Sequence, residues 1–263
     1  MKNINRLLLG LLLAFSFSVS TVRAQNDTMY VMKNGVVINK QSLKETDVDS
    51  IVFYKVTTTP ACGGSVTFTY NGASVTYGTV ASAGKCWLDR NLGATQVATK
   101  STDEYSYGDL FQWGRGADGH QRSGTISTLS ASDVPGHAKF ILAPSSPYDW
   151  RSPQNDNLWQ GVNGTNNPCP SGYRVPTEAE FVAERTSWGS DNSAGAFASP
   201  LKLTMAGFRN GNDGSYCPND INGLYWCSTV DGVNSRLLHF KSNSANMFSN
   251  NRADALAVRC IKN

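Results

Sequence analysis

Residues 169–182 of the chain read CPSGYRVPTEAEFV, and they contain the clearest helix start in the sequence. Thr177 and Glu180 stand three residues apart directly before an apolar face, which is the capping-box pattern of a helix N-terminus. Each side-chain oxygen accepts a hydrogen bond from a backbone N–H that the helix leaves unpaired. The sequence places no His, Cys or second carboxylate beside them, so we assign Glu178 and Glu180 to capping rather than catalysis.

Short strands and long loops are predicted on both sides of this helix. After it, residues 201–230 alternate between apolar runs and Gly/Asn turns, and residues 237–240 and 257–261 are typical of two closing strands. Residues 241–251 hold seven Asn or Ser in eleven positions, so we predict a polar loop there. Before the helix, residues 116–168 have few periodic apolar positions and are predicted to form surface loops.

A β-hairpin is predicted around Asn71-Gly72, because this dipeptide between alternating apolar residues is the strongest short hairpin signal. The stretch at 107–115 is aromatic and Gly-rich. We interpret it as buried aromatic side chains around a tight turn, in preference to a platform that binds a cationic ligand. The large side chains assigned to the core and its buried hydrogen bonds are Trp87, Trp113, Trp226 and Arg259.

Composition divides the chain into four segments. A basic start, an apolar run and small residues near residue 24 predict a signal peptide, and the run is too short to span a bilayer. Apolar runs around Asn34-Gly35 predict a second hairpin, and residues 50–54 a third short strand. The predicted segments are a signal peptide at 1–24, a small N-terminal β unit at 25–57, a linker at 58–60 and the main domain at 61–263.

The formal charge of +3 belongs to the predicted signal peptide. Residues 1–24 hold three of the 23 basic residues and no acidic one, so their removal from the 263-residue chain leaves 239 residues with 20 bases and 20 acids. A neutral chain has no global field that attracts nucleic acid or an anionic membrane, and we expect neither nucleic-acid binding nor membrane insertion. Charged residues make up 16% of the chain, below the ~25% of an average soluble protein. Such a composition favours an exported protein, whether extracellular, cell-surface or periplasmic.

Six cysteines behind a predicted signal peptide indicate up to three disulfides. Cys62 and Cys86 bracket the predicted hairpin, where a bond would close its base. The chain has no CxxC pair and its three His are far apart, so we expect no zinc site and no cofactor. Residues 210–214 resemble a calcium loop in oxygen content but lack the acidic residue about seven positions beyond the Gly, and we predict a turn.

Six motifs occur in the order seen in a known family. They are WLDRNLG at 87–93, GDLFQWGR at 108–115, CPSGYRVPTEAEF at 169–181, AGFR at 206–209, YWCST at 225–229 and VRC at 258–260. In this order they resemble the Fibrobacter succinogenes major paralogous domain, over about residues 61–263. The resemblance implies an α+β, C-type-lectin-like fold that is loop-rich and disulfide-linked, with antiparallel sheets and one clear helix. The N-terminal unit resembles a short segment common at the start of secreted Bacteroidetes proteins.

The resemblance also implies a pairing of the cysteines. It joins Cys169 to Cys260 and leaves Cys217 and Cys227 as a third pair. A Ser usually stands at the position of Cys227 in the family, so a free thiol is the alternative there. Related formylglycine-generating proteins use cysteines in surroundings that this chain does not match, and the calcium-loop motifs of sugar-binding C-type lectins are absent from the sequence. We therefore expect no enzymatic activity.

We expect a secreted or cell-surface, non-catalytic binding or adhesion module whose ligand is a protein or a glycan. One alternative is a structural subunit of a surface or fimbrial assembly that pairs through residues 25–57. Another is a variable ligand-binding protein of a diversity-generating retroelement, which the C-terminal stretch resembles. Positions interleaved with core residues in that stretch are Asn234, Arg236, His239, Lys241, Asn243, Asn246, Asn250 and Asn251. The predicted ligand contacts are Tyr225, Asp231, Asn234, Arg236, His239, Lys241 and Asn243.

Overall fold

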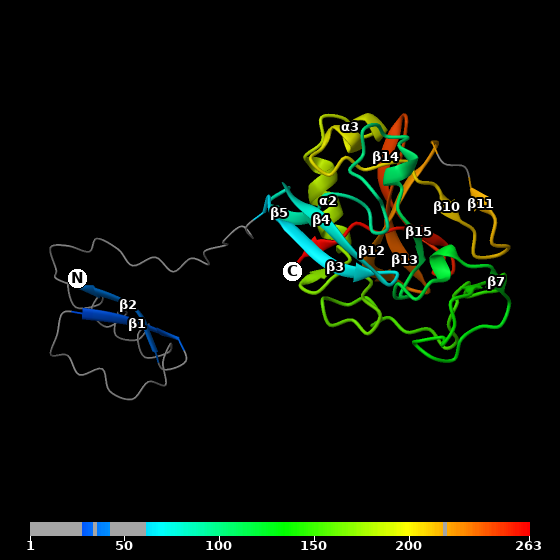
Figure 1. Ribbon diagram of the computed structural model, residues 1–263, viewed down its shortest axis with the longest axis horizontal. Coiled ribbons are helices and arrows are strands. Elements are labelled where there is room, and N and C mark those ends of the chain that lie inside the picture. The colour runs from blue at the N-terminus through cyan, green and yellow to red at the C-terminus, as the bar shows by residue number, and fades with distance from the viewer. Residues whose placement is uncertain (1–27, 34–35, 43–61, 218–219) are drawn as a thin grey trace, which may run out of the picture. The chain divides into compact units, whose positions relative to one another are not determined.

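A computed structural model of the protein describes residues 28–33, 36–42, 62–217 and 220–263 (Figure 1). The chain divides into two compact units, Met1–Thr57 and Thr58–Asn263. In the first unit, β1 (Thr28–Lys33) and β2 (Val36–Ser42) form an antiparallel two-stranded sheet, which confirms the predicted hairpin strands. The predicted signal peptide, third short strand and linker lie outside the described residues. Among the residues that are described, no helix has the length and apolar character needed to cross a membrane.

A five-stranded sheet brings together the beginning and the end of the second unit. Its order is β3-β4-β5-β16-β9. The strands are β3 (Ser65–Tyr70), β4 (Ala73–Ser82), β5 (Lys85–Leu88), β9 (Tyr173–Arg174) and β16 (Ile261–Lys262). The predicted hairpin is confirmed, and Asn71 and Gly72 both have the positive φ that a tight hairpin turn requires, 49° and 79°.

A larger sheet of seven strands forms the rest of this unit. Its order is β11-β10-β15-β12-β13-β14, and β6 pairs with β15. The strands are β6 (Leu110–Gln112), β10 (Phe208–Arg209), β11 (Tyr216–Cys217), β12 (Gly223–Asp231), β13 (Asn234–Lys241), β14 (Ser244–Asn250) and β15 (Ala255–Ala257). The last long strands, β12 to β14, form an antiparallel meander with β14 at the edge. A separate short pair, β7 (Thr125–Ile126) and β8 (Phe140–Ile141), is parallel.

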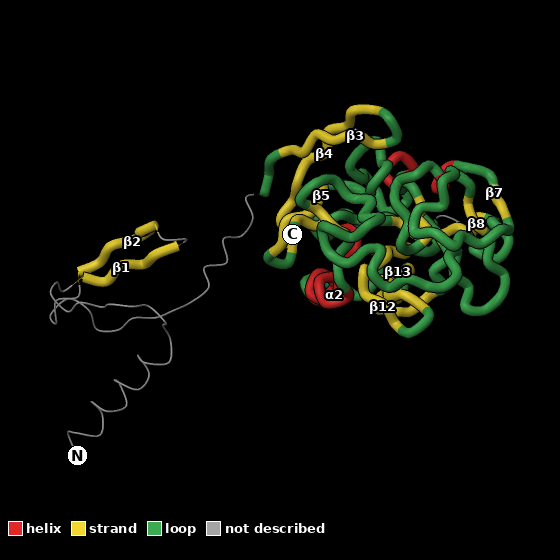
Figure 2. Tube along the Cα trace, turned by 90° about the horizontal axis from the view of Figure 1, so that it is seen from below, coloured by secondary structure: helices red, strands yellow, loops and turns green. Residues whose placement is uncertain are grey.

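The predicted capping box starts helix α2 (Glu178–Thr186), which lies beside β12 and β13 (Figure 2). The Thr177 hydroxyl accepts from the Glu180 backbone N–H at 3.4 Å, and a Glu180 carboxylate oxygen accepts from the Thr177 N–H at 2.8 Å. The one clear helix predicted from the sequence is therefore confirmed, and a second, shorter helix, α3 (Ser193–Ala198), follows it, capped by Asn192. Two short 3₁₀ helices, η1 (Glu104–Ser106) and η2 (His120–Arg122), complete the described helical elements.

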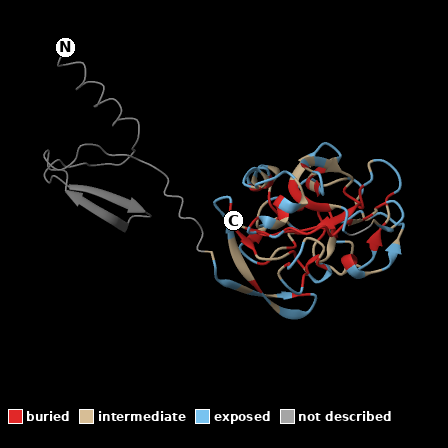
Figure 3. Ribbon diagram, turned by 90° about the horizontal axis from the view of Figure 1, so that it is seen from above, coloured by how far each residue is buried: buried red, intermediate tan, exposed pale blue. Residues whose placement is uncertain are grey.

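Two large clusters of apolar side chains lie one on each face of the β12–β13 pair, and a third, small cluster consists of Ile141, Trp150 and Leu158. Side chains alternate across a sheet, so Trp226 and Leu237 enter one cluster while Tyr225 and Leu238 enter the other. Buried residues follow these central strands, and exposed ones lie on the peripheral loops and on the β3–β4 hairpin (Figure 3). The four large side chains predicted for the core, Trp87, Trp113, Trp226 and Arg259, are all buried.

Two predicted loop segments contribute to the core. Residues 116–168 were expected at the surface, yet they supply buried side chains, which are Phe140, Ile141, Trp150, Leu158 and Trp159. The predicted polar loop at 241–251 contains strand β14, whose Ala245 and Met247 pack into the cluster beside α2. Two inward apolar positions at a spacing of two are enough for a strand that pairs along its whole length with β13.

Two of the three predicted disulfides are formed, Cys62–Cys86 and Cys169–Cys260. The third prediction was wrong, since Cys217 and Cys227 are both free. They lie on β11 and β12, and strands β10 and β15 separate these two in the sheet. Three strand spacings amount to roughly 14 Å, whereas a disulfide requires Cα atoms within about 7 Å.

Candidate functional site

Tyr225, a predicted ligand contact, belongs to the core. Its hydroxyl accepts from the Asn91 side-chain amide at 3.0 Å and from the Thr204 backbone N–H at 2.8 Å, and it donates to the Thr204 carbonyl at 3.0 Å. The ring stacks on Phe240 with centroids 5.9 Å apart. The prediction that Tyr225 contacts a ligand was wrong, because the neighbouring Trp226 points into one core cluster and Tyr225 therefore points into the other.

Arg236 holds helix α2 against the sheet. Its Nε and Nη2 donate to one Glu178 carboxylate oxygen at 2.9 and 2.6 Å, and its Nη1 donates to the Ser249 hydroxyl at 2.7 Å. Asp231, exposed beside the β12–β13 turn, lies 3.6 Å from the same guanidinium and accepts from Ser249. Asn234, paired with Asp231 in the sheet, is partly exposed. The side chains of these three predicted contacts reach solvent, but the N–H donors of Arg236 are already hydrogen-bonded to Glu178 and Ser249.

His239 and Lys241 lie on the opposite face of β13 from Arg236. Phe248, on the neighbouring β14, is 49% exposed, and its ring centroid lies 5.5 Å from that of His239. Asn246 pairs directly with His239 across the strands. We call the exposed and partly exposed side chains here the β13–β14 surface, which consists of Asn222, His239, Lys241, Asn243, Asn246 and Phe248.

The β13–β14 surface combines one aromatic face with several amide groups. Nε2 of His239 is 2.9 Å from Oδ1 of Asn222. Burial and then the charge of Lys241 lower the pKa of His239, so the imidazole is neutral near pH 7 and holds its place by hydrogen bonding. His239, Asn246 and Phe248 sit on paired strands, which fixes their spacing before any ligand arrives. Such a surface can stack against an apolar face and exchange hydrogen bonds with hydroxyl or amide groups.

Phe248 and Asn222 were missing from the predicted contacts. Phe248 was overlooked because the Asn and Ser around it favoured a loop. A period-two pattern, in which Ala245 and Met247 alternate with Asn246 and Phe248, would have indicated the strand. Asn222 carries no local signal, since the turn before β12 brings it to His239 over 17 residues.

His120 is the most perturbed histidine, and it is enclosed. Its Nδ1 lies 2.6 Å from an Asp118 carboxylate oxygen, and its Nε2 accepts from the Gln112 backbone N–H at 3.0 Å. Burial lowers the pKa of His120 to about 4, against the pull of Asp118, so the ring is neutral with its proton on Nδ1. Both nitrogens are used inside the protein, which suits a structural role better than acid–base chemistry.

The two free thiols are also poorly suited to chemistry. Burial raises the pKa of Cys227 well above its ordinary value, and burial together with Asp254 raises the pKa of Cys217. Protonated thiols are weak nucleophiles and weak metal ligands. Within residues 62–217 and 220–263 and the two described N-terminal strands, no group of three His, Cys, Asp or Glu side chains is placed to hold a metal ion.

The chain matches no family model, no curated protein and no solved structure. The resemblance to the Fibrobacter succinogenes major paralogous domain therefore depends on the six motifs and stays a prediction. The structure itself establishes a mostly β, loop-rich domain of mainly antiparallel sheets with two α-helices and two disulfides among the described residues.

Proposed function

We propose that this protein is an exported, non-catalytic binding module with a C-type-lectin-like fold, and that its β13–β14 surface contacts a protein or glycan ligand. The observation that carries the proposal is the exposed Phe248 ring packed beside His239 on two fully paired strands. Disulfides persist in oxidising compartments, so Cys62–Cys86 and Cys169–Cys260 support export to the cell surface or beyond.

Phe248 supplies the expected binding energy. A Phe side chain buries about 150–250 Å² when it is covered, so the exposed half offers about 100 Å² of apolar surface. At about 25 cal/mol per Å², covering that area stabilises a complex by about 2.5 kcal/mol. Asn246 pairs with His239 across the strands and Asn222 contacts the His239 ring, and their side-chain amides would provide hydrogen bonds that orient the ligand.

The test is binding of the purified protein to glycan and protein arrays, followed by affinity measurements with Phe248→Ala. We expect Phe248→Ala to weaken binding of the identified ligand by at least about tenfold, because the variant loses an aromatic contact. Val182→Ala is the matched control, because Val182 is also partly exposed but lies on α2, which covers the opposite face of the sheet. Equal affinities for Phe248→Ala and the unchanged protein would remove the β13–β14 surface from the proposal.

The β1–β2 sheet favours a second candidate, a subunit of a surface assembly. Each of these strands pairs on one side only among the described residues, which leaves backbone groups for a partner strand. Deletion of residues 25–60 should then abolish assembly and leave ligand binding intact. Assembly that is unchanged by the deletion would exclude this candidate.

A more specific form of the proposed binding function is a variable ligand-binding protein of a diversity-generating retroelement. The interleaved positions of the C-terminal strands support it. Each of the eight interleaved residues is at least partly exposed, and core residues such as Leu237 and Leu238 separate them. A near-copy of the 3′ end of the gene beside a reverse transcriptase, differing only at adenines, would support it. A genome without any such template would refute it.

A further inference from the structure

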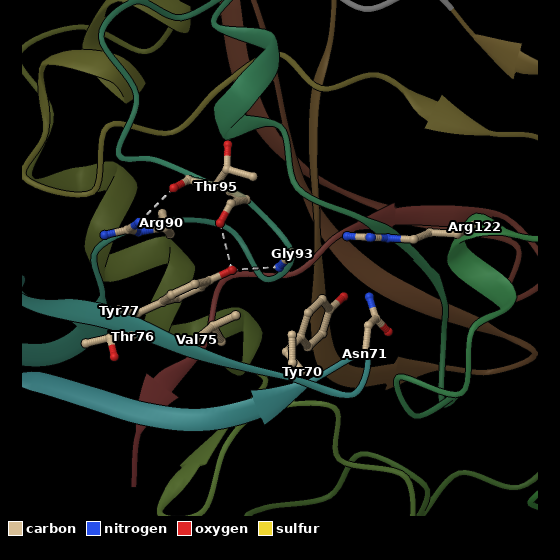
Figure 4. Close-up of a pocket in the computed structure, with 11 residues that line it drawn as sticks. Tyr70, Asn71, Val75, Thr76, Tyr77, Arg90, Gly93, Thr95 and Arg122 are labelled. Carbon is tan, nitrogen blue, oxygen red and sulfur yellow. Dashed lines mark hydrogen bonds between the residues drawn. The ribbon is translucent and has the colours of Figure 1, made fainter.

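A cavity of about 420 Å³ lies beside the β3–β4 hairpin and shares no residue with the β13–β14 surface. Its walls come from the hairpin at residues 70–77, the loop at 90–95 and Arg122 at the end of η2 (Figure 4). The volume falls within the range of about 300–1,000 Å³ that is typical of small-molecule sites.

The guanidinium of Arg122 is held in place through its Nε, and its Nη groups remain free to bind a ligand. Its Nε donates to both carboxylate oxygens of Asp109, at 2.9 and 3.0 Å. Asp109 is fixed in turn by the Tyr70 hydroxyl, which donates to it at 2.7 Å. Neither Nη group of Arg122 has a hydrogen-bond partner in the described part of the chain, and the side chain is 56% exposed. In Figure 4 the guanidinium reaches toward Tyr70 and Gly93.

Arg90, on the other wall, is held by three hydrogen bonds to the protein. Its Nε and Nη2 donate to the two oxygens of Asp89 at 2.7 and 2.9 Å, and its Nη1 donates to the Thr95 carbonyl at 3.2 Å. The guanidinium also lies over the Tyr77 ring, 4.8 Å from the centroid. Arg90 therefore shapes the wall and has no free fork of donors for a ligand.

The loop at 90–95 is anchored by Tyr77. The Tyr77 hydroxyl donates to the Ala94 carbonyl at 2.8 Å and accepts from the Gly93 N–H at 3.0 Å. Burial raises the pKa of Tyr77 to about 12, so this hydroxyl keeps its proton at neutral pH. Because both walls are held by internal hydrogen bonds, the cavity keeps its shape without a ligand.

These charges limit what the cavity can bind. Two arginines face two aspartates, and only the Nη groups of Arg122 are available, in a planar fork that matches the two oxygens of a carboxylate. Among the described residues of the lining, a dianionic group finds no second free cation. The rest of the lining is uncharged. The Thr95 hydroxyl donates to the Tyr105 carbonyl at 3.1 Å and can still accept a hydrogen bond. The Asn71 side chain accepts from Gln121 at 3.1 Å and keeps a second N–H besides the one 3.5 Å from Asp109. This combination suits a ligand with one carboxylate on a body that carries several hydroxyl groups.

We infer that the hairpin cavity binds a sugar that carries a carboxylate, with the carboxylate on the Nη groups of Arg122 and the hydroxyl groups toward Asn71 and Thr95. The site is separate from the β13–β14 surface, so either can fail without the other. Phe248→Ala should leave binding in the cavity unchanged.

Calorimetric titration of the purified full chain with D-glucuronate, glucose and glucose 6-phosphate tests the inference. Glucuronate should bind at least about tenfold more tightly than glucose, because hydrogen bonds to a charged group contribute about 1.5–3 kcal/mol. Glucose 6-phosphate should bind more weakly than glucuronate. Equal binding of glucuronate and glucose, or tighter binding of the phosphate, would overturn the inference.

Variants at Arg122 locate the site. Arg122→Gln should weaken the binding of glucuronate by about tenfold or more. Arg122→Lys keeps the charge but not the planar fork of donors, so its affinity should lie between those of Arg122→Gln and the unchanged protein. Lys100→Gln, which removes an exposed charge outside the cavity, is the control. If Arg122→Gln fails to fold, the site is tested by amide NMR of the unchanged protein. Binding of glucuronate in the cavity must shift the resonances of the Gly93 backbone amide and the Asn71 side-chain amide. Unchanged resonances, or full affinity in Arg122→Gln, would refute the site.

Discussion

His120 should make the protein lose stability as the pH falls from neutral toward 4. The imidazole is fully buried, donates from Nδ1 to Asp118 and accepts at Nε2 from the Gln112 N–H. Protonation of Nε2 would replace an acceptor with a donor facing another donor, inside a site with no water contact. This conflict and the burial explain why the pKa is lowered to about 4 from the ordinary value of 6.5.

The sign and the size of the effect follow from the shift. Above pH 6.5 His120 is neutral in both the folded and the unfolded chain, and its contribution to the unfolding free energy is fully present. Between pH 6.5 and about 4 the unfolded chain takes up a proton that the folded chain does not, so stability falls with pH. At about 1.36 kcal/mol per pKa unit, the total loss is about 3 kcal/mol, and it is complete below pH 4.

Urea unfolding followed by tryptophan fluorescence between pH 7.5 and 4.5 measures this loss. We expect the unfolding free energy to fall by about 2 kcal/mol over that range from His120 alone. His239 has a pKa lowered in the same direction, so the measurement is made in a His239→Asn background. His120→Gln in that background should flatten the profile above pH 5.

The result that would refute this reasoning is a His120 imidazole that titrates near pH 6.5 in the folded protein by NMR. A pH profile that is the same with and without His120→Gln would refute it as well. Buried Asp149 and Asp254 have raised pKa values and act with the opposite sign, because they favour the folded state as they protonate. A gain of stability on acidification would therefore show that these carboxyl groups outweigh His120.

Three further predictions concern the cross-links, the thiols and the helix. Replacing Cys169 and Cys260 together by Ser should lower the unfolding free energy by about 4–5 kcal/mol in urea, since the bond closes a 91-residue separation. A thiol reagent should label Cys217 in the folded protein and Cys227 only after unfolding, as counted by mass spectrometry; a third disulfide would leave no site to label. Thr177→Ala should cost about 1 kcal/mol through loss of the cap, and an unchanged melting temperature would contradict this role.

The features that sequence reasoning predicted correctly are short-range. The Asn71-Gly72 turn, the Thr177 cap and the Cys62–Cys86 bond each depend on residues within 24 positions of one another. Turn geometry and capping are local physics, so residue types and spacing are enough to predict them. The Cys169–Cys260 bond spans 91 positions, and its correct prediction came from the resemblance rather than from spacing.

The errors came from sheet order and register. Pairing Cys217 with Cys227 assumed one hairpin, whereas two strands from elsewhere in the chain lie between them. Assigning Tyr225 to the surface required knowing which face of β12 packs on α2, and a shift of one residue reverses that choice. The Arg236–Glu178 contact joins residues 58 positions apart, so no local pattern indicates that this arginine is occupied.

The two faces of the β13–β14 pair differ in how much they contribute to the core. On one face, Leu238, Phe240 and Met247 pack beneath the helices, and Arg236 holds Glu178, so a change there disturbs the core. On the other face, Leu237 is buried, whereas His239 is partly exposed and Phe248 is exposed to solvent. Because backbone hydrogen bonds to both neighbours hold β13 whatever its outward side chains are, outward residues can change without moving the strand. Substitutions on the outward face should therefore change its contact chemistry at little cost in stability, as the proposed binding function requires.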